Sequence, residues 1–115
     1  MFSRIAAVLS LLAVAAVVNG EGCFSGGQSG DCSSIIGSFC NNLGGNMVSG
    51  ETRTQCFNVN GFKCDMRIIN EGGSRVPDVN ACFEAMDDEA SGCSTGGIKT
   101  INDFQFTLDP NTGSC

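Results

Sequence analysis

The amino-acid sequence predicts a small α+β domain, a disulfide-stapled helix/sheet sandwich with a mostly antiparallel sheet. Three observations lead to this fold class. Apolar and polar residues alternate on both sides of Asn60-Gly61, a pattern typical of a β-hairpin. Two other stretches space their apolar residues by three and four, as helices with one buried face do. The chain also has eight cysteines in 115 residues, and an even number in so short a chain predicts four disulfides.

The first 20 residues are expected to be a secretory signal peptide. Arg4 supplies one positive charge, and an apolar run then extends to Val18, interrupted only by a serine. The run is short for a bilayer span, and Val18 and Gly20 are the small residues expected before a cleavage site. An uncleaved membrane anchor is the alternative, but no basic flank follows the run. We therefore expect cleavage after Gly20 and one secreted, extracellular domain over residues 21–115.

The first elements of that domain are a short strand within residues 21–27 and a helix over residues 31–43. Asp31 is a suitable N-cap for the helix, and Gly44-Gly45 is a suitable end. A hairpin follows over residues 51–69, turning at Asn60-Gly61. The expected order then continues with a second helix and a last strand, to give β-α-β-β-α-β.

The hairpin register separates two cysteines. With a two-residue turn at Asn60-Gly61, Phe57 lies opposite Cys64 and shares its face of the sheet. Cys56 then points to the other face. This parity indicates that Cys56 and Cys64 are not bonded to each other, and that something covers or crosses each face.

The second helix is expected from Pro77 or Asp78 to Ala90, and the last strand over residues 104–108. A Pro-Asn-Thr-Gly turn and the terminal Cys115 follow the strand. A terminal strand frays unless it is anchored, so Cys115 is expected to be disulfide-bonded. The nearest candidate is Cys93, which predicts the pair Cys93–Cys115, although eight cysteines allow 105 connectivities.

Composition excludes several function classes. The net charge is −6, and an acidic surface repels phosphate backbones and anionic membranes. We therefore expect no nucleic-acid partner and no stable membrane insertion. There is no histidine and no Cys-x-x-Cys pair, so neither a metal site nor a cofactor is expected.

Carboxylates are the remaining candidates for acid/base chemistry, and they are densest at Glu84, Asp87, Asp88 and Glu89. A glycosidase needs two carboxylates facing each other across a cleft, which one exposed helix face does not provide. A solvated acidic face is the favoured interpretation, and no enzymatic activity is predicted. Because Asp87-Asp88-Glu89 fall in the last helical turn, where negative charge opposes the helix dipole, a bound calcium ion stays open as an alternative.

Seven short motifs resemble those of a known family, the small secreted fungal glycan-binding proteins typified by the ink-cap mushroom lectin known as Y-three. The motifs are Cys23-Phe24 (CF), Cys40 to Gly45 (CNNLGG), Gly50-Glu51 (GE), Gln55 to Asn58 (QCFN), Gly92-Cys93 (GC), Gly96-Gly97 (GG) and Asp109 to Cys115 (DPNTGSC). The resemblance spans Cys23 to Cys115. A fainter likeness, in topology, is to the fungal-virus killer toxins and their effector relatives.

The resemblance implies a helix/sheet/helix sandwich and a non-catalytic, lectin-like protein whose partner is a cell-surface or extracellular glycan or glycoprotein. The alternative is a secreted toxin or host-interacting effector acting on a protein or membrane target. Six cysteines match the family pattern and Cys32 and Cys64 are additional, which implies a Cys32–Cys64 bond. Ligand contacts are expected at exposed polar loop positions, namely Asn70, Arg75, Asp109 and Asn111.

Overall fold

The structure is a computed structural model that describes residues 21–115. The predicted signal peptide lies outside the described residues. The elements in chain order are β1 (Gly22–Cys23), a 3-10 turn η2 (Ser33–Ile35), α1 (Ile36–Cys40), β2 (Thr52–Val59), β3 (Phe62–Asn70), α2 (Val79–Gly92), β4 (Gly97–Ile101) and β5 (Phe104–Asn111). The strands form one sheet in the order β1-β4-β5-β3-β2, and every neighbouring pair is antiparallel. The α+β class and the mostly antiparallel sheet are confirmed.

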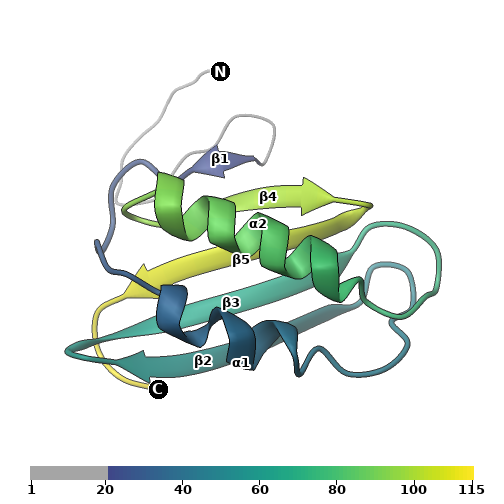
Figure 1. Cartoon of the computed structure of the whole chain (residues 1–115), viewed down its shortest axis with the longest axis horizontal. Coiled ribbons are helices and arrows are strands. Elements are labelled where there is room, and N and C mark those ends of the chain that lie inside the picture. Colours follow the sequence, from purple (N-terminus) through teal and green to yellow (C-terminus); the bar gives the residue numbers. More distant parts are fainter. Residues whose placement is uncertain (1–20) are drawn as a thin grey trace.

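Both helices lie on the same side of this sheet. Figure 1 shows α2 in front of β4 and β5, and α1 in front of β2 and β3. Residues 21–115 therefore form two layers, and the helix/sheet/helix sandwich implied by the resemblance is wrong. No helix in residues 21–115 has the length and apolar character needed to cross a membrane.

The central hairpin has the predicted register. Phe57 pairs with Cys64 and Val59 pairs with Phe62, so Cys64 points toward the helices and Cys56 points away from them. Gly61 closes the turn at φ 83°, a conformation that costs glycine little because it has no Cβ. The alternation of side chains along β2 and β3 thus assigns one face to the core and the other to the opposite surface.

A strand that the sequence prediction missed, β4, forms a second hairpin with β5. Its turn is Asn102-Asp103, whose φ angles are 53° and 60°, and these two residue types tolerate the left-handed region. Just before the strand, Gly96 has φ 84°, and a Cβ there would lie 2.2 Å from the carbonyl oxygen of Leu108. The Gly96-Gly97 motif therefore allows close approach of the chain to β5.

The helices differ from prediction at their ends. The first is shorter, and Asp31 accepts a hydrogen bond from Ser33 N at 2.9 Å ahead of a 3-10 turn. The helix then ends at Cys40, and Asn41-Asn42 form a turn before Leu43. The second helix begins as predicted after Asp78, whose carboxylate caps Ala81 N at 3.0 Å. It continues to Gly92, two residues beyond the predicted end.

The core lies between the helices and the inner face of the sheet. It combines apolar residues of both helices with alternate residues of the central strands, and its largest members are phenylalanines. The most buried large side chains are Phe39, Phe104, Phe106, Ile36, Met47, Met66, Ile68, Met86 and Leu108. Removing such surface from water is the main favourable contribution to folding.

The chain has four disulfides: Cys23–Cys93, Cys32–Cys64, Cys40–Cys82 and Cys56–Cys115. The Cys32–Cys64 pair is the one that the resemblance implied. The predicted Cys93–Cys115 pair is wrong, because the two residues lie at opposite edges of the sheet. Cys93 follows α2 beside β1, whereas the chain after β5 crosses the end of β3 to reach Cys56 on β2. There Cys115 N donates to Asn58 Oδ1 at 2.9 Å.

Candidate functional site

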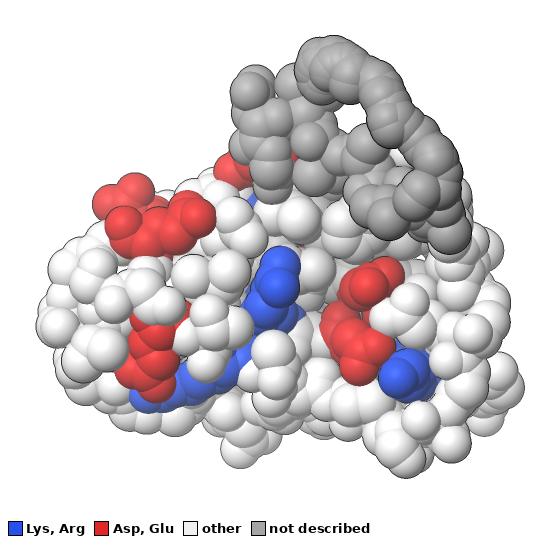
Figure 2. Space-filling view, turned by 180° about the vertical axis from the view of Figure 1, so that it is seen from behind, with Lys and Arg blue, Asp and Glu red and all other residues white. Residues whose placement is uncertain are grey.

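The face of the sheet that points away from both helices, called the open face below, carries the alternate side chains of β2, β3 and β5. Its central strand β3 presents Lys63, Asp65 and Arg67, and β5 places Asn111, Asp109 and Thr107 directly beside them in register. Figure 2 views the molecule from this side and shows basic and acidic side chains next to one another. The open face is therefore polar and mixed in charge.

A hollow of about 480 Å³ is set into the open face. It extends from β2 across β3 and β5 to the segment after β1, so it uses strands from both hairpins. Its lining residues are Phe24, Thr54, Gln55, Cys56, Asp65, Met66, Arg67, Ile98, Thr107 and Asp109. Its volume falls in the range of sites that bind small molecules.

Arg67 lies at the centre of the hollow. It pairs in register with Thr54 on one side and Thr107 on the other, and its Nη2 donates to Thr107 Oγ1 at 3.3 Å. Its Nε is buried and has no hydrogen-bond partner within residues 21–115. A buried N–H without a partner is costly, so this side chain has unused capacity to donate a hydrogen bond.

The acidic part of the hollow is organised by Asn111. Its Nδ2 donates to Asp65 Oδ2 at 2.7 Å and to the carbonyl oxygen of Asp109 at 3.3 Å. Lys63 Nζ lies 3.7 Å from Asp65 Oδ2. Burial raises the pKa of Asp109, with the Asp65 carboxylate adding to the effect and the Asn111, Arg67 and Lys63 side chains opposing it. The site thus offers carboxylate acceptors beside a guanidinium donor.

Phe24 and Ile98 supply apolar surface to the hollow. Phe24 is half-buried and is fixed by its backbone, since its N–H donates to Gly96 O at 2.9 Å and its carbonyl accepts from Thr95 Oγ1 at 2.8 Å. Phe39, Phe104 and Phe106 are buried in the core. Among the hollow's lining residues, Phe24 is the one with an aromatic ring.

The four contact residues predicted from the sequence are divided by the structure. Asp109 lines the hollow and Asn111 lies beside it on β5, whereas Asn70 and Arg75 lie at the other end of β3 and in the loop after it. Asn70 is fully buried. Its side-chain nitrogen donates to the carbonyls of Met47 and Gly73 at 3.0 and 2.8 Å. The expectation that Asn70 is an exposed contact is therefore wrong.

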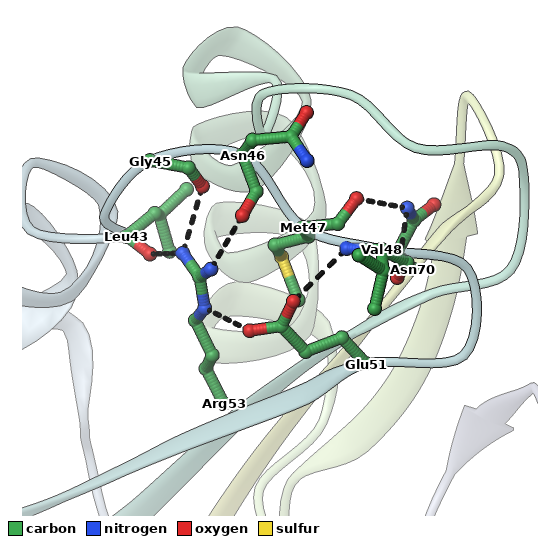
Figure 3. A network of polar contacts seen from close by, with 8 residues as sticks. All are labelled: Leu43, Gly45, Asn46, Met47, Val48, Glu51, Arg53 and Asn70. Carbon is green, nitrogen blue, oxygen red and sulfur yellow. Dashed lines mark hydrogen bonds and ion pairs between the residues drawn. The ribbon is translucent and has the colours of Figure 1, made fainter.

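Asn70 belongs to a network that fixes the loop between α1 and β2, and Figure 3 shows its centre at Arg53. The Arg53 guanidinium donates to the carbonyls of Leu43, Gly45 and Asn46, each at 2.8 Å. Its Nε pairs with Glu51 at 2.8 Å. These charge-assisted bonds satisfy a run of loop carbonyls, so the CNNLGG and GE motifs have a structural role here.

Arg75 has a structural role as well. Its guanidinium lies 4.0 Å above the ring of Phe104, a cation–π contact, and its Nη2 donates to the carbonyl of Asn102 in the β4–β5 turn. The acidic group on α2 separates too, because Asp88 pairs with Lys99 at 2.5 Å and Glu89 is buried. No three metal-ligating side chains converge within residues 21–115.

Sequence reasoning missed Phe24, Arg67 and Thr107, which form the hollow together with Asp65 and Asp109. The alternation in Lys63–Arg67 did carry a signal, since it places every second side chain opposite the core-facing Cys64 and Met66. The ligand contacts predicted from the sequence were placed in loops, whereas most residues of the hollow lie on strands. The prediction also lacked β4, which brings the β1 end and Phe24 to the sheet.

The fold and the hollow together define a class: a small disulfide-bonded binding protein in which a rigid layer of helices supports an open, polar sheet face. The particular family follows from comparison with known proteins. The chain belongs to the family of the glycan binding domain Y3, whose family model matches residues 31–115. The resemblance stated from the motifs is thereby confirmed.

A curated relative is the antiviral protein CAP of the fungus Coprinus comatus. It is 34% identical over 91 residues, which cover 73% of this chain and 90% of the relative. The match to the family model includes both hairpins and the terminal DPNTGSC motif. Four disulfides in so small a domain are consistent with an extracellular location.

Proposed function

We propose that the protein is a secreted, non-catalytic lectin that binds a glycan in the hollow of its open face. The observation that carries this proposal is the joint presence there of an aromatic ring, Phe24, a guanidinium group, Arg67, and a carboxyl group, Asp109. The family membership supports the ligand class. The predicted signal peptide and the four disulfides support secretion.

Sugars need both kinds of contact. One side of a pyranose ring exposes C–H groups that pack on a flat apolar surface, and its edge exposes hydroxyls that donate and accept hydrogen bonds. Phe24 supplies the surface. The Arg67 guanidinium supplies donors, and the carboxyl group of Asp109 supplies an acceptor on the neighbouring strand.

Charge points to neutral sugars as the ligand. The open face sets Lys63 and Arg67 against Asp65 and Asp109, so the two signs balance. A charged sugar would gain no net attraction from this balanced set and would lose hydration of its own charge in a partly buried site. We expect uncharged saccharides, with their hydroxyls shared between Arg67 and Asp109, to bind best.

A glycan array followed by calorimetry tests the proposal. The secreted, oxidised protein is expected to bind a discrete set of neutral glycans, and the free sugar is expected to compete. For the best ligand, Arg67→Met is expected to lower affinity about tenfold or more, since a hydrogen bond to a charged group contributes about 1.5–3 kcal/mol. Phe24→Leu, which removes the flat ring, is expected to lower affinity by a similar factor. Asp87→Asn, on the exposed side of α2, is the control and is expected to leave affinity unchanged.

Two results would contradict the proposal. An empty array from a folded sample would show that the scaffold is present without sugar binding, and would favour the toxin or effector alternative. Release of sugar from a bound glycoside, lost in Asp65→Asn or Asp109→Asn, would instead show that the two carboxylates act as a catalytic pair.

A further inference from the structure

A second hollow, of about 370 Å³, lies between α2, β1 and β4. It lies on the α2 side of β1, at the edge of the sheet farthest from β2. Its lining residues are Glu21, Gly22, Cys23, Asp88, Glu89, Gly92, Cys93, Ile98 and Lys99. The Cys23–Cys93 disulfide forms part of its wall, so the hollow is held open by a covalent bond.

Glu89 is the unusual residue in this hollow. Its side chain projects from α2, and only 3% of the residue is exposed. Neither carboxylate oxygen has a hydrogen-bond partner within the described residues. A carboxylate buried without partners is strongly destabilising, so the site is incomplete as it stands.

The neighbouring charged side chains do not provide a hydrogen-bond partner for Glu89 among residues 21–115. Lys99 on β4 is the basic residue of the hollow, and its ammonium is bound to Asp88 at 2.5 Å. Glu21, just before β1, accepts from Thr100 N at 3.0 Å. Burial raises the pKa of Glu89 to about 9, with the Glu21 and Asp88 carboxylates adding to the effect and Lys99 opposing it. The hollow thus contains three carboxyl groups and one ammonium group.

With this pKa the Glu89 carboxyl group is protonated at neutral pH, and a small cation entering the hollow would favour its ionised form. A metal ion is disfavoured, since the carboxyl groups do not converge into a ligand set among residues 21–115. A primary ammonium group needs fewer partners than a metal ion. One carboxylate acts as its counter-ion, and one or two further oxygens accept its remaining N–H groups. Glu89 and Glu21 provide these from two different elements.

We propose that this hollow is a binding site for a protonated primary amine, with Glu89 as its counter-ion. The same chemistry has two sources. One is the chain's own α-amino group, because cleavage after Gly20 would create it on Glu21, a residue that already lines the hollow. The other is an external amine such as an amino sugar. The first source depends on the predicted cleavage, and neither depends on sugar binding at the open face.

The test starts from the full coding sequence expressed in a secreting host, with the mature terminus read by mass spectrometry. The side-chain carboxyl of Glu89 is followed by NMR through a pH titration and is assigned by comparison with Glu89→Gln. One sample keeps its free terminus. In a second, the α-amino group is acetylated near pH 6.5, where it reacts ahead of lysine because its pKa is about 8 rather than about 10. Methylammonium is then added to each, with tetramethylammonium, which has no N–H group, as the control.

Each outcome has a defined meaning. A Glu89 titration midpoint lower by about 1–3 pH units in the free-terminus sample than in the acetylated one, as expected for an adjacent opposite charge, supports the site with the chain's own terminus as occupant. A saturable lowering by methylammonium in the acetylated sample, absent with tetramethylammonium and in Glu89→Gln, supports an external amine. If neither the free terminus nor methylammonium lowers the midpoint, the proposal is wrong. A terminus other than Glu21 excludes the first source and leaves the methylammonium titration to decide.

Discussion

The two faces of the sheet use the same strands for opposite purposes. Along β3, Cys64, Met66 and Ile68 point toward the helices and are at most 1% exposed. Lys63 and Arg67, between and beside them, point to the open face and remain half-buried. The inner face is apolar, whereas neither helix of residues 21–115 covers the open face, where basic and acidic side chains lie at the surface (Figure 2).

The contrast between the two faces explains how a domain this small can support a binding surface. Stability comes from one face and from disulfides such as Cys32–Cys64 and Cys40–Cys82, whose sulfurs lie in the core. The open face is then free to hold charged groups such as Arg67 and Asp109, which are costly for folding and useful for binding. Variants on each side of the sheet test this division.

The largest effect is expected on the inner face. Phe106→Ala removes a fully buried ring and is expected to lower the free energy of unfolding by about 3–5 kcal/mol, because it loses apolar burial and leaves a cavity. Urea unfolding monitored by circular dichroism measures this. The control is Gln105→Ala, because Gln105 directly precedes Phe106 on β5 and its side chain points to the open face. Equal effects from the two variants would remove the distinction between the faces.

The next effect concerns the disulfide on the open side. Replacing both Cys56 and Cys115 by alanine is expected to lower the free energy of unfolding by about 2–4 kcal/mol, because the unfolded chain loses a cross-link. The final turn is expected to fray, since Asn58 holds Cys115 by a single hydrogen bond. Hydrogen exchange is expected to rise after Asn111 and to stay unchanged in the core. Faster exchange at Phe106 would show that this bond supports the inner face as well.

For each pH unit, a smaller effect of at most about 1.4 kcal/mol is expected from Glu89. With the terminus acetylated and no amine added, the folded state binds one proton more than the unfolded state between the unfolded pKa near 4.5 and the folded value of about 9. Stability therefore falls as pH rises through that window. Urea unfolding at pH 5 to 9 measures the slope. Glu89→Gln is expected to flatten it and Asp87→Asn to leave it; a slope that persists in Glu89→Gln would assign it to another group.

The smallest effect on stability is expected on the open face. Asp109→Asn keeps the size of a side chain whose charge burial already disfavours, so the free energy of unfolding is expected to change by about 0.5 kcal/mol or less. Affinity for the best neutral glycan is expected to fall even so. Thermal unfolding and calorimetry on the same sample separate the two. A large loss of stability would show that the open face also carries the fold.

Parts of this architecture could be predicted from local patterns. The hairpin register around Gly61 follows from period-two alternation and a two-residue turn, and the start of α2 follows from the Asp78 cap, because these signals act within a few residues. The β4–β5 hairpin could not be recognised, since Asn102-Asp103 is a weaker turn signal and β4 is short. The open-face residues were visible as alternate positions on β3, but the hollow they form was not.

Composition, periodicity and motifs are properties of the chain, and they were enough to predict a small α+β domain with four disulfides, a central hairpin and a glycan-binding family. Other features depend on how the elements pack. Packing joined Cys115 to Cys56 rather than Cys93, buried Asn70 and brought Phe24 to Arg67 and Asp109. It also left the Glu89 carboxyl oxygens without a hydrogen-bond partner among residues 21–115. These outcomes depend on which strands become neighbours, and strand order is set by packing between segments far apart in sequence, which no local pattern encodes.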